Sequence, residues 1–394
     1  ILTDPHDPNY TDEAQVREEL TRVFDVCRSC RRCIDRCGSF PTLFEMLDAR
    51  DGSEAGDLTP AQQDAVVDEC HHCKLCATEC PYAPGRHEAG VDVPKVMLRA
   101  AAMRRANGHA VARPRAARLA GRADRIGRAA TRVPAVAYRV VGAANGSVTR
   151  RMLSRFSGLC SARSLPQYTA RRFTEWFAER PKVTLRRPQS SVVVFPTCLV
   201  EYHRPEIGSD LVRVYERNGI ECSPASVGCC GAPSLHAGDL DRFAKVAEAN
   251  VRTLAGAIRS GADVVVPQPA CGYVVRRDYT DHVGEERRED AELVAAHTYD
   301  AAEYLMRLHR TDAAVLDTTF GPDTPRTIVY AVPPQLVALD IGLTSRDLLK
   351  LTGARVRVTR VRSGLDGPWG CLLYTSDAAD EHRDVGVGVG GGGG

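Results

Sequence analysis

The sequence lacks any long apolar run. No stretch approaches the roughly 18 uninterrupted apolar residues that a membrane-spanning helix needs. The nearest one, residues 133–146, is short and contains Arg139. We therefore expect a chain that does not cross a bilayer, although it could lie against one. The first residues, ILTDPHDPNYTDEAQ, are acidic and polar and have no apolar secretory signal. We expect a cytoplasmic protein, either free or peripheral on the inner face of the cell membrane.

The chain also has little excess charge of one sign and few aromatic residues. Its formal net charge is +2 and its aromatic content is 6%, so the averages exclude no class of partner. Residues 99–187 differ, because they contain 20 Arg and one Lys against three acidic residues. We expect residues 107–190 to be a basic Ala/Arg-rich linker, or a surface for anionic lipid headgroups or an acidic partner subunit. Aromatic residues hardly interleave with these charges before Tyr168, which argues against nucleic acid.

Cysteine, by contrast, is abundant, and eight of the 15 cysteines form two runs with the same spacing, C-x2-C-x2-C-x3-C. A disulfide framework rarely repeats one tight cluster, and zinc sites usually use two separated pairs. A C-x2-C-x2-C loop wraps three thiolates around one 4Fe–4S cluster, and its fourth cysteine reaches a second cluster. The spacing therefore predicts two 4Fe–4S clusters with exchanged ligands. The first set is Cys27, Cys30, Cys33 and Cys80; the second is Cys70, Cys73, Cys76 and Cys37.

The residues around these two cysteine runs give weaker indications of cluster binding. Pro81 follows the second run as in bacterial ferredoxins, whereas Gly38 follows the first. His71 and His72 lie between predicted ligands, and we expect them to be exposed or to pack beside the ligands rather than to bind metal. Basic side chains in the loops either offset cluster charge and raise the potential or are simply solvated. These are Arg28, Arg31, Arg32 and Lys74.

The remaining patterns predict two kinds of fold. Helical spacing and capping residues predict a compact helical domain over residues 1–106. From residue 191 strands alternate with helices, which predicts an α/β domain with a parallel sheet over 191–312. The expected strands are 191–195, 220–226, 262–268, 327–332 and 354–359; the expected helices between them are 204–219, 241–261, 299–310 and 345–353.

A second set of cysteines follows the strands of this α/β region. Cys198 follows the first strand, Cys229 and Cys230 the second, and Cys271 the third. Because the carboxyl ends of parallel strands meet in one crevice, we expect these four thiols to converge and bind a cofactor. The alternative is a set of ordinary buried thiols, which is also our expectation for the isolated Cys160 and Cys222. Near the crevice, His203 and His236 are expected to serve packing or hydrogen bonding rather than proton donation.

Paired quartets followed by C-x30-CCG-x39-C resemble the iron–sulfur oxidoreductase subunits with CCG domains. This family includes the iron–sulfur subunits of anaerobic glycerol-3-phosphate dehydrogenase, heterodisulfide reductase, glycolate oxidase and lactate oxidase. The resemblance covers about residues 1–370, and the order of parts is most similar to the first of these. It implies a ferredoxin-like domain that passes electrons from a partner dehydrogenase, expected to be a flavoprotein, to the CCG module and on to a quinone or another acceptor. Such a subunit need not turn over a substrate alone.

The sequence departs from the family pattern at several positions. Gln268 occupies the first position of the closing C-x-x-C, so four candidate ligands remain instead of five. Residues 313–370 resemble the start of a second, cysteine-depleted CCG unit, with Pro334 in place of the opening cysteine and Arg362, Ser363 and Gly364 in place of Cys-Cys-Gly. Two further functions stay open: a disulfide reductase with catalysis at Cys229 and Cys230, and a redox-sensing protein without turnover.

The last segment is unlike the rest. Residues 371–394 read CLLYTSDAADEHRDVGVGVGGGGG. Their first part resembles a translated sequencing adapter, so we expect the natural protein to stop near Gly370; the alternative is a flexible Gly-rich tail. In either case Cys371 carries no weight as a site residue.

Overall fold

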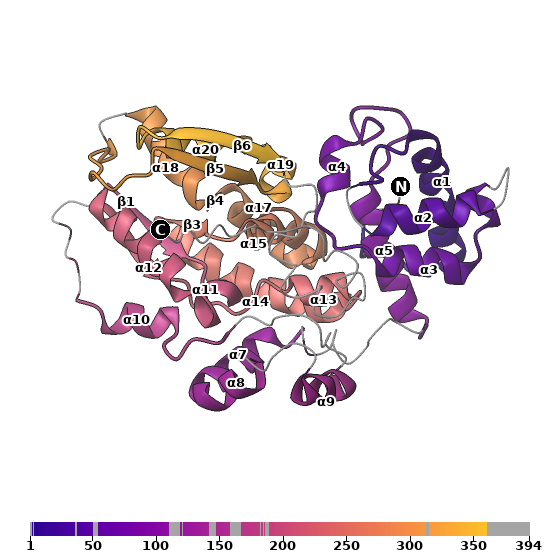
Figure 1. The fold of residues 1–394 in the computed structure, drawn as a ribbon, viewed down its shortest axis with the longest axis horizontal. Helices are drawn as coiled ribbons and strands as arrows, with labels where there is room; N and C mark the ends of the chain where they lie inside the picture. Colours follow the sequence, from indigo (N-terminus) through magenta and orange to yellow (C-terminus); the bar gives the residue numbers. More distant parts are fainter. Residues whose placement is uncertain are drawn as a thin grey trace.

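The computed structural model describes residues 2, 4–35, 38–49, 54–109, 119, 121–141, 147–157, 167–181, 183, 185, 189–312 and 315–360. They form a helical N-terminal part beside a larger part built on a parallel sheet, which occupies the left of Figure 1. Several residues discussed above lie outside the described residues: Cys37, Cys160, Arg362, Ser363, Gly364 and all of 371–394.

The N-terminal part is a bundle of helices whose starts are fixed by capping side chains. Asp12 accepts a hydrogen bond from the Gln15 amide, and Thr59 and Gln62 form a reciprocal capping box. The apolar faces of the helices share one core, so the expected helical domain is confirmed. The elements are α1 (Glu13–Cys30), α2 (Ser39–Asp48), the 3₁₀ turn η1 (Ala55–Asp57), α3 (Pro60–Asp68), α4 (Leu75–Glu79) and α5 (Val93–Ala106).

The second part is built on a four-stranded parallel sheet with the strand order β2-β1-β3-β4. Along β1, Val193 faces one core and its neighbours Val192 and Val194 face the other. Both faces are therefore covered, as the continuous valine runs require. The strands are β1 (Ser190–Val194), β2 (Ile220–Pro224), β3 (Ala262–Val266) and β4 (Thr298–Asp300), and the longer helices around them are α12 (Pro205–Arg217), α14 (Leu240–Arg259), α17 (Glu285–Ala296) and α18 (Ala301–Thr311).

The expected parallel sheet is confirmed, but one expected helix begins later than predicted, and several helices were not predicted. Strand β4 takes Tyr299 and Asp300 from the start of the expected helix 299–310, which begins instead at Ala301. Helix α17 was not foreseen because its sequence, EERREDAELVAA, is too polar to show a clear apolar face. The chain after β3 also forms α15 (Pro269–Tyr273), a π-helical turn η2 (Val274–Asp278) and α16 (Tyr279–His282).

Residues after 312 form a smaller unit. Strands β5 (Thr327–Val332) and β6 (Arg355–Arg360) pair in parallel as a separate two-stranded sheet. Between them lie α19 (Pro334–Ala338) and α20 (Thr344–Lys350). The expected strand–helix–strand order is present, and α19 contacts both α4 and α15.

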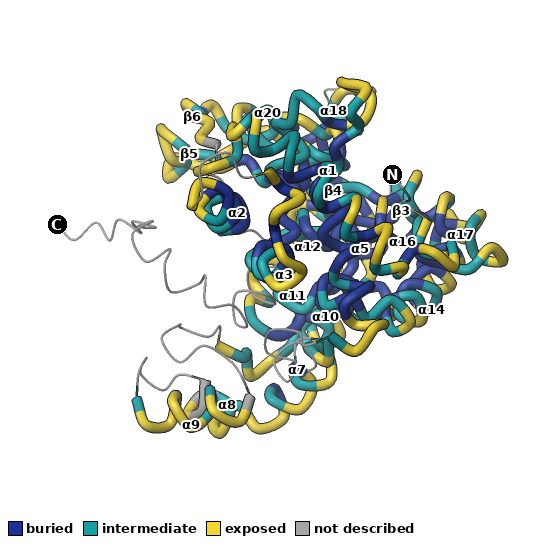
Figure 2. Tube along the Cα trace, turned by 90° about the vertical axis from the view of Figure 1, so that its right-hand side faces the viewer, coloured by how far each residue is buried: buried dark blue, intermediate teal, exposed yellow. Residues whose placement is uncertain are grey.

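The basic middle segment contributes helices at the edge of the molecule. They are α7 (Ala123–Arg132), α8 (Pro134–Val141), α9 (Val148–Ser157) and α10 (Phe173–Glu179). Helix α7 is anchored, because the Tyr202 hydroxyl of α11 (Cys198–Tyr202) donates to Asp124 at 2.6 Å. Helices α8 and α9 are largely exposed and lie apart from the buried core in Figure 2. No helix among the residues described is both long and apolar enough to span a membrane.

The packing of α12 against α10 gives a first test. A Cβ added at Gly208 would lie 2.6 Å from both Phe173 and Val200. We expect Gly208→Ala to lower the free energy of unfolding by about 1–3 kcal/mol through overpacking. Gly256→Ala in α14 is the matched control, because its Cβ would meet nothing within 4 Å. It should raise stability by about 0.5–1 kcal/mol. Urea unfolding checks both; equal stability of the two variants would contradict this packing.

Candidate metal centres

The first cysteine loop begins at the end of α1. Arg31 adopts the left-handed conformation (φ 51°), and its amide donates to the carbonyl of Cys27 at 2.8 Å. Cys27, Cys30 and Cys33 then line one pocket with Cys80 from the second loop. Burial and the neighbouring thiols of Cys33, Cys80 and Cys30 raise the pKa of Cys27. The structure thus brings together the four residues that the exchanged spacing assigned to the first cluster.

The second loop lines an adjoining pocket. Its lining includes Cys70, Cys73 and Cys76, and Cys76 also borders the first pocket. His72 and Lys74 both adopt left-handed conformations, with φ of 51° and 68°, which curl the loop before α4 begins. The fourth member of the predicted set, Cys37, lies outside the described residues.

His71 and His72 pack beside the predicted ligands, so the exposed placement that the sequence left open was wrong. They are only 7% and 5% exposed, and the Nδ1 atom of His72 lies 3.9 Å from the Sγ atom of Cys70. Lys74 is equally buried, with its ammonium group 4.8 Å from the ring centre of Tyr273. Burial holds the pKa of His72 well below its usual value, and it lowers the pKa of His236 to about 3. Both imidazoles are therefore neutral at neutral pH.

The α/β part brings the second set of cysteines together. Cys198 opens α11 after β1, Cys229 and Cys230 follow β2, and Cys271 lies in α15 after β3. The Sγ atoms of Cys230 and Cys271 are 3.1 Å apart, and the Cys229 thiol is hydrogen-bonded by those of Cys198 and Cys230. None of these four described cysteines forms a disulfide bond. The convergence expected from the parallel sheet is thus present in the structure.

Hydrogen bonds among these thiols shift the pKa values of Cys229 and Cys230 in opposite directions. Cys229 accepts hydrogen bonds from the thiols of Cys198 and Cys230, and these hold the pKa of Cys229 well below its usual value. Cys230 donates hydrogen bonds to Cys229 and Cys271, and these raise the pKa of Cys230. Cys271 also donates to the amide oxygen of Gln268 at 3.5 Å. Gln268, which stands where the family pattern has a cysteine, therefore still faces the group.

Two polar residues that the sequence analysis missed support the loop of Cys229 and Cys230. Asn250 donates to the carbonyl of Cys229 at 3.0 Å, and the Tyr279 hydroxyl donates to that of Cys230 at 3.0 Å. Asn250 also donates to the Tyr279 hydroxyl at 2.8 Å. The sequence offers one signal for Asn250, which is a polar residue among the apolar residues on one face of α14. Gly231 (φ 89°) is required here, because a Cβ would lie 2.9 Å from Phe243.

The two histidines near the crevice differ in their roles. His236 is buried on α13 (Ala232–His236) and stacks on His72. His203 contacts the carbonyl of Gln167 at 2.9 Å and packs on Tyr168. Both make packing or hydrogen-bond contacts, as expected. The isolated Cys222 is buried in β2 and lies outside the three groups of thiols.

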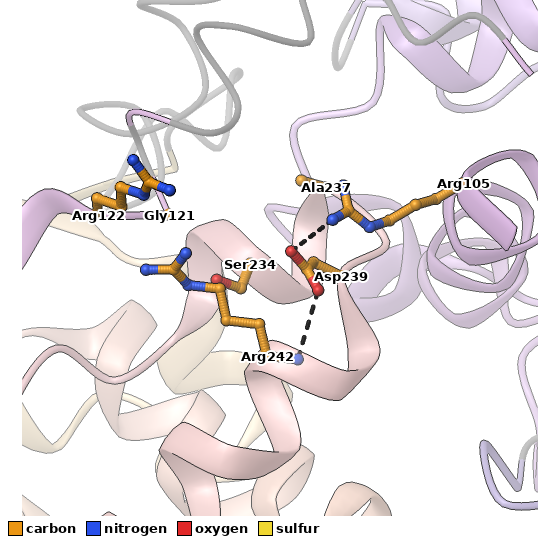
Figure 3. A pocket seen from close by; sticks show the side chains of 7 residues that line it. All are labelled: Arg105, Gly121, Arg122, Ser234, Ala237, Asp239 and Arg242. Atoms are coloured by element: carbon orange, nitrogen blue, oxygen red, sulfur yellow. Dashed lines mark hydrogen bonds and ion pairs between the residues drawn. The ribbon is translucent and has the colours of Figure 1, made fainter. Parts of the chain in front are cut away.

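A cavity of about 300 Å³ lies beside α13 (Figure 3). Arg105 of α5 bridges to Asp239 at 2.7 Å, while Arg122 and Arg242 lie together on the other side of the cavity. The charge of Arg242 contributes to the lowered pKa of Cys229, after the hydrogen bonds to that thiol. The cavity is therefore electrostatically linked to the CCG cysteines.

The described thiols fit iron–sulfur clusters in their chemistry, because thiols are the ligands that such clusters take. No three described His, Cys, Asp or Glu side chains converge closely enough to hold a single metal ion. The cysteines of a 4Fe–4S cluster each bind a different iron, so they need not converge on one point.

Comparison with known proteins gives the same two domains. The family described as 4Fe-4S dicluster domain matches residues 19–81, and the one described as cysteine-rich domain, CCG, matches residues 192–276. No solved structure matches the chain significantly.

Several curated proteins are similar over part of the chain. A fumarate reductase (CoM/CoB) subunit from Methanothermobacter marburgensis is 34% identical over 24% of this chain and 19% of its own length. An anaerobic glycerol-3-phosphate dehydrogenase subunit from Escherichia coli is 28% identical over 34% of each chain. Lactate utilization protein A from Shouchella clausii is 30% identical over 31% of this chain and 50% of its own length. The matched region thus spans from a fifth to half of these relatives.

The geometry and the comparisons agree on the order of parts along the chain. Thiols gather in the helical N-terminal region and again at the carboxyl ends of the parallel strands, within the two matched ranges. The protein thus carries a 4Fe–4S dicluster domain followed by a CCG cysteine-rich domain, and its homologues include subunits of a fumarate reductase and of an anaerobic glycerol-3-phosphate dehydrogenase.

Proposed function

We propose that this protein is the electron-transfer subunit of an oxidoreductase complex. It accepts electrons from a partner dehydrogenase, which we take to be a flavoprotein, and delivers them to a quinone or another acceptor. The observation that carries the proposal is the gathering of cysteines in three places, two adjoining pockets in the helical domain and the convergent group of the CCG domain. Relatives that are subunits of multi-subunit enzymes support a dehydrogenase partner.

In this proposal the two N-terminal pockets each hold a 4Fe–4S cluster, and the CCG thiols hold a further one. When bound, such clusters supply one-electron carriers whose potentials respond to nearby charge and solvent. The protein's own residues keep the ligand thiols together and exclude water. Phe40 lies between the two N-terminal pockets and lines both of them. The four thiols of the CCG site are the number that one ordinary cluster takes.

The partner is proposed to dock near the first cysteine loop. Arg31 and Arg32 are exposed there, and Ile34 is 43% exposed. An exposed apolar side chain among basic ones suits an acidic partner surface with an apolar centre. The second loop, with its buried His71, His72 and Lys74, faces the CCG domain instead.

The basic middle segment is proposed to bind the surface of an anionic membrane. On α9, Val148, Met152 and Phe156 recur at four-residue spacing and are 72%, 57% and 69% exposed. Arg151 and Arg155 are exposed on the same helix. A helix that exposes apolar residues beside arginines is typical of interfacial membrane binding. Such a location would bring the protein close to a membrane-bound quinone.

A disulfide reductase is a second candidate, favoured by the arginine-lined cavity beside α13 (Figure 3). A disulfide with an anionic group could bind Arg122 and Arg242 near Cys229 and Cys230. Its cleavage would consume two electrons, supplied by the partner dehydrogenase, and two protons, and would release two thiols. Anaerobically reconstituted protein, reduced and then offered a menaquinone analogue or a mixed disulfide, separates the two functions by which acceptor reoxidises it. If neither does, redox sensing without turnover becomes the better function.

The ligand assignment can be tested by iron content. Cys33→Ala should remove about four iron atoms per chain from the anaerobically reconstituted protein, because one cluster loses a ligand while the other keeps its set. Cys222→Ala is the matched control, since this buried cysteine lies outside the three groups of thiols. Iron and sulfide analysis measures the loss. An unchanged iron content in Cys33→Ala would contradict the assignment.

Membrane binding can be tested with vesicles. We expect the protein to sediment with vesicles of phosphatidylglycerol at low ionic strength and to be released by salt. The double variant Met152→Ser, Phe156→Ser should sediment several-fold less. Val329→Ser is the control, because Val329 is 67% exposed on β5, outside the basic segment. If the double variant binds as well as the wild type, α9 is not the membrane contact.

A further inference from the structure

The two domains meet at the second cysteine loop. There the ring of His72 from the loop stacks on the ring of His236 from α13, with centroids 4.6 Å apart and planes inclined by 20°. Both side chains are buried, at 5% and 7% exposure. They come from positions 164 residues apart in the chain and form a direct aromatic contact across the interface.

Each ring comes from a chain segment that lies next to a different group of thiols in the sequence. His72 lies between Cys70 and Cys73, and its Nδ1 atom is 3.9 Å from the Sγ atom of Cys70. His236 ends the short helix that follows Gly231, and the amides of Ser234 and Leu235 bond back to the Gly231 carbonyl. The stacked pair therefore spans the distance from the second quartet to the helix that opens directly after Cys229 and Cys230.

The surrounding contacts between α5 and the CCG domain limit how far the two rings can move relative to each other. Arg105 of α5 bridges to Asp239 at 2.7 Å, and Lys95 of α5 bridges to Asp281 of α16 at 3.2 Å. Gly238 packs so closely on α5 that a Cβ would lie 2.3 Å from the carbonyl oxygen of Ala101. Ion pairs on exposed surfaces contribute little alone, but the close backbone approach at Gly238 leaves the interface little freedom to shift.

The first quartet has no such connection in the described structure. Two aromatic pairs lie near its pocket, Phe40 with Phe44 at 6.1 Å between centroids and Tyr82 with His87 at 4.8 Å, and all four residues belong to the N-terminal domain. The exposed residues of its loop, Arg31, Arg32 and Ile34, face solvent. The two quartets are thus unequal: only the loop of the second is buried against the CCG domain through an aromatic contact.

We propose that the stacked rings of His72 and His236 form the electron path between the second quartet and the CCG cysteines, which makes the second quartet the exit of the dicluster domain. The inference rests on the proposed electron-transfer function and adds the order of the centres. Electrons cross one at a time by tunnelling, so neither ring is oxidised, reduced or protonated in the step. Tunnelling slows steeply as the gap between contacting groups widens, and the ring stack closes that gap at the domain interface.

The test uses the full chain, reconstituted anaerobically, with rapid reduction and freeze-quench EPR. We expect His236→Leu to delay the signal of the CCG centre several-fold, because it removes the ring. His236→Phe, which keeps an aromatic ring, should be close to the wild type. His87→Leu is the control, since it removes a ring beside the first quartet only. Iron content, EPR line shapes and midpoint potentials should stay the same in all three variants, so that a changed rate reports the path.

The outcomes separate the inference from the function on which it rests. If the CCG signal of His236→Leu rises at the wild-type rate, the path is wrong although electron transfer stands. If His236→Phe is as slow as His236→Leu, the aromatic stack is not the conducting contact and the proposal also fails. If the wild-type protein shows no CCG-centre signal and no iron beyond the two N-terminal clusters, the proposed function itself fails at this site, and the path fails with it.

Discussion

The structure depends on holding groups of partly or fully buried thiols side by side. Close packing of ionisable thiols is unfavourable for their charged forms, and the raised pKa of Cys27, caused by burial and by three neighbouring thiols, is the direct sign of this cost. Metal binding requires thiolates, so iron would have to offset both the burial and the mutual repulsion. We therefore expect folding of the N-terminal domain to be coupled to cluster binding, with the core around Leu20 and Phe44 supplying the rest of the stability.

The same constraint explains the buried charge at the domain interface. Burial acts to lower the pKa of Lys74, but Asp278, Tyr273 and other groups raise it overall, so the ammonium group stays charged. Burial raises the pKa of Asp278, against the effect of Lys74. Buried charges such as these contribute little net stability, because desolvation offsets their attraction to other groups. If the second quartet holds the proposed cluster, a fixed positive charge two residues from Cys76 would raise its reduction potential.

Much of this arrangement is predictable from local patterns. Valine runs predict β1 and β3, and strand ends in a parallel sheet predict that Cys198, Cys229, Cys230 and Cys271 meet. The burial of His72 was not predictable, because it depends on His236, which is distant in the sequence. Likewise β4 has only three residues, too few to show a period, and its place is set by pairing with β3. Local sequence patterns thus predict which cysteines lie together, whereas contacts between distant segments decide how the two domains meet.

Gln268 shows how such packing limits the chemistry of the CCG site. Its amide oxygen accepts a hydrogen bond from Cys271, so the position keeps contact with the thiols although it supplies no sulfur. An amide oxygen is a hard ligand and iron–sulfur clusters take thiolates, so four ligands are what this site offers. Four thiolates suit a carrier that receives and passes single electrons. Hydrogen bonds from Asn250 and Tyr279 to the carbonyls of Cys229 and Cys230 hold this loop in place. A rigid site changes little on reduction, which favours fast electron transfer over bond cleavage at the same cysteines.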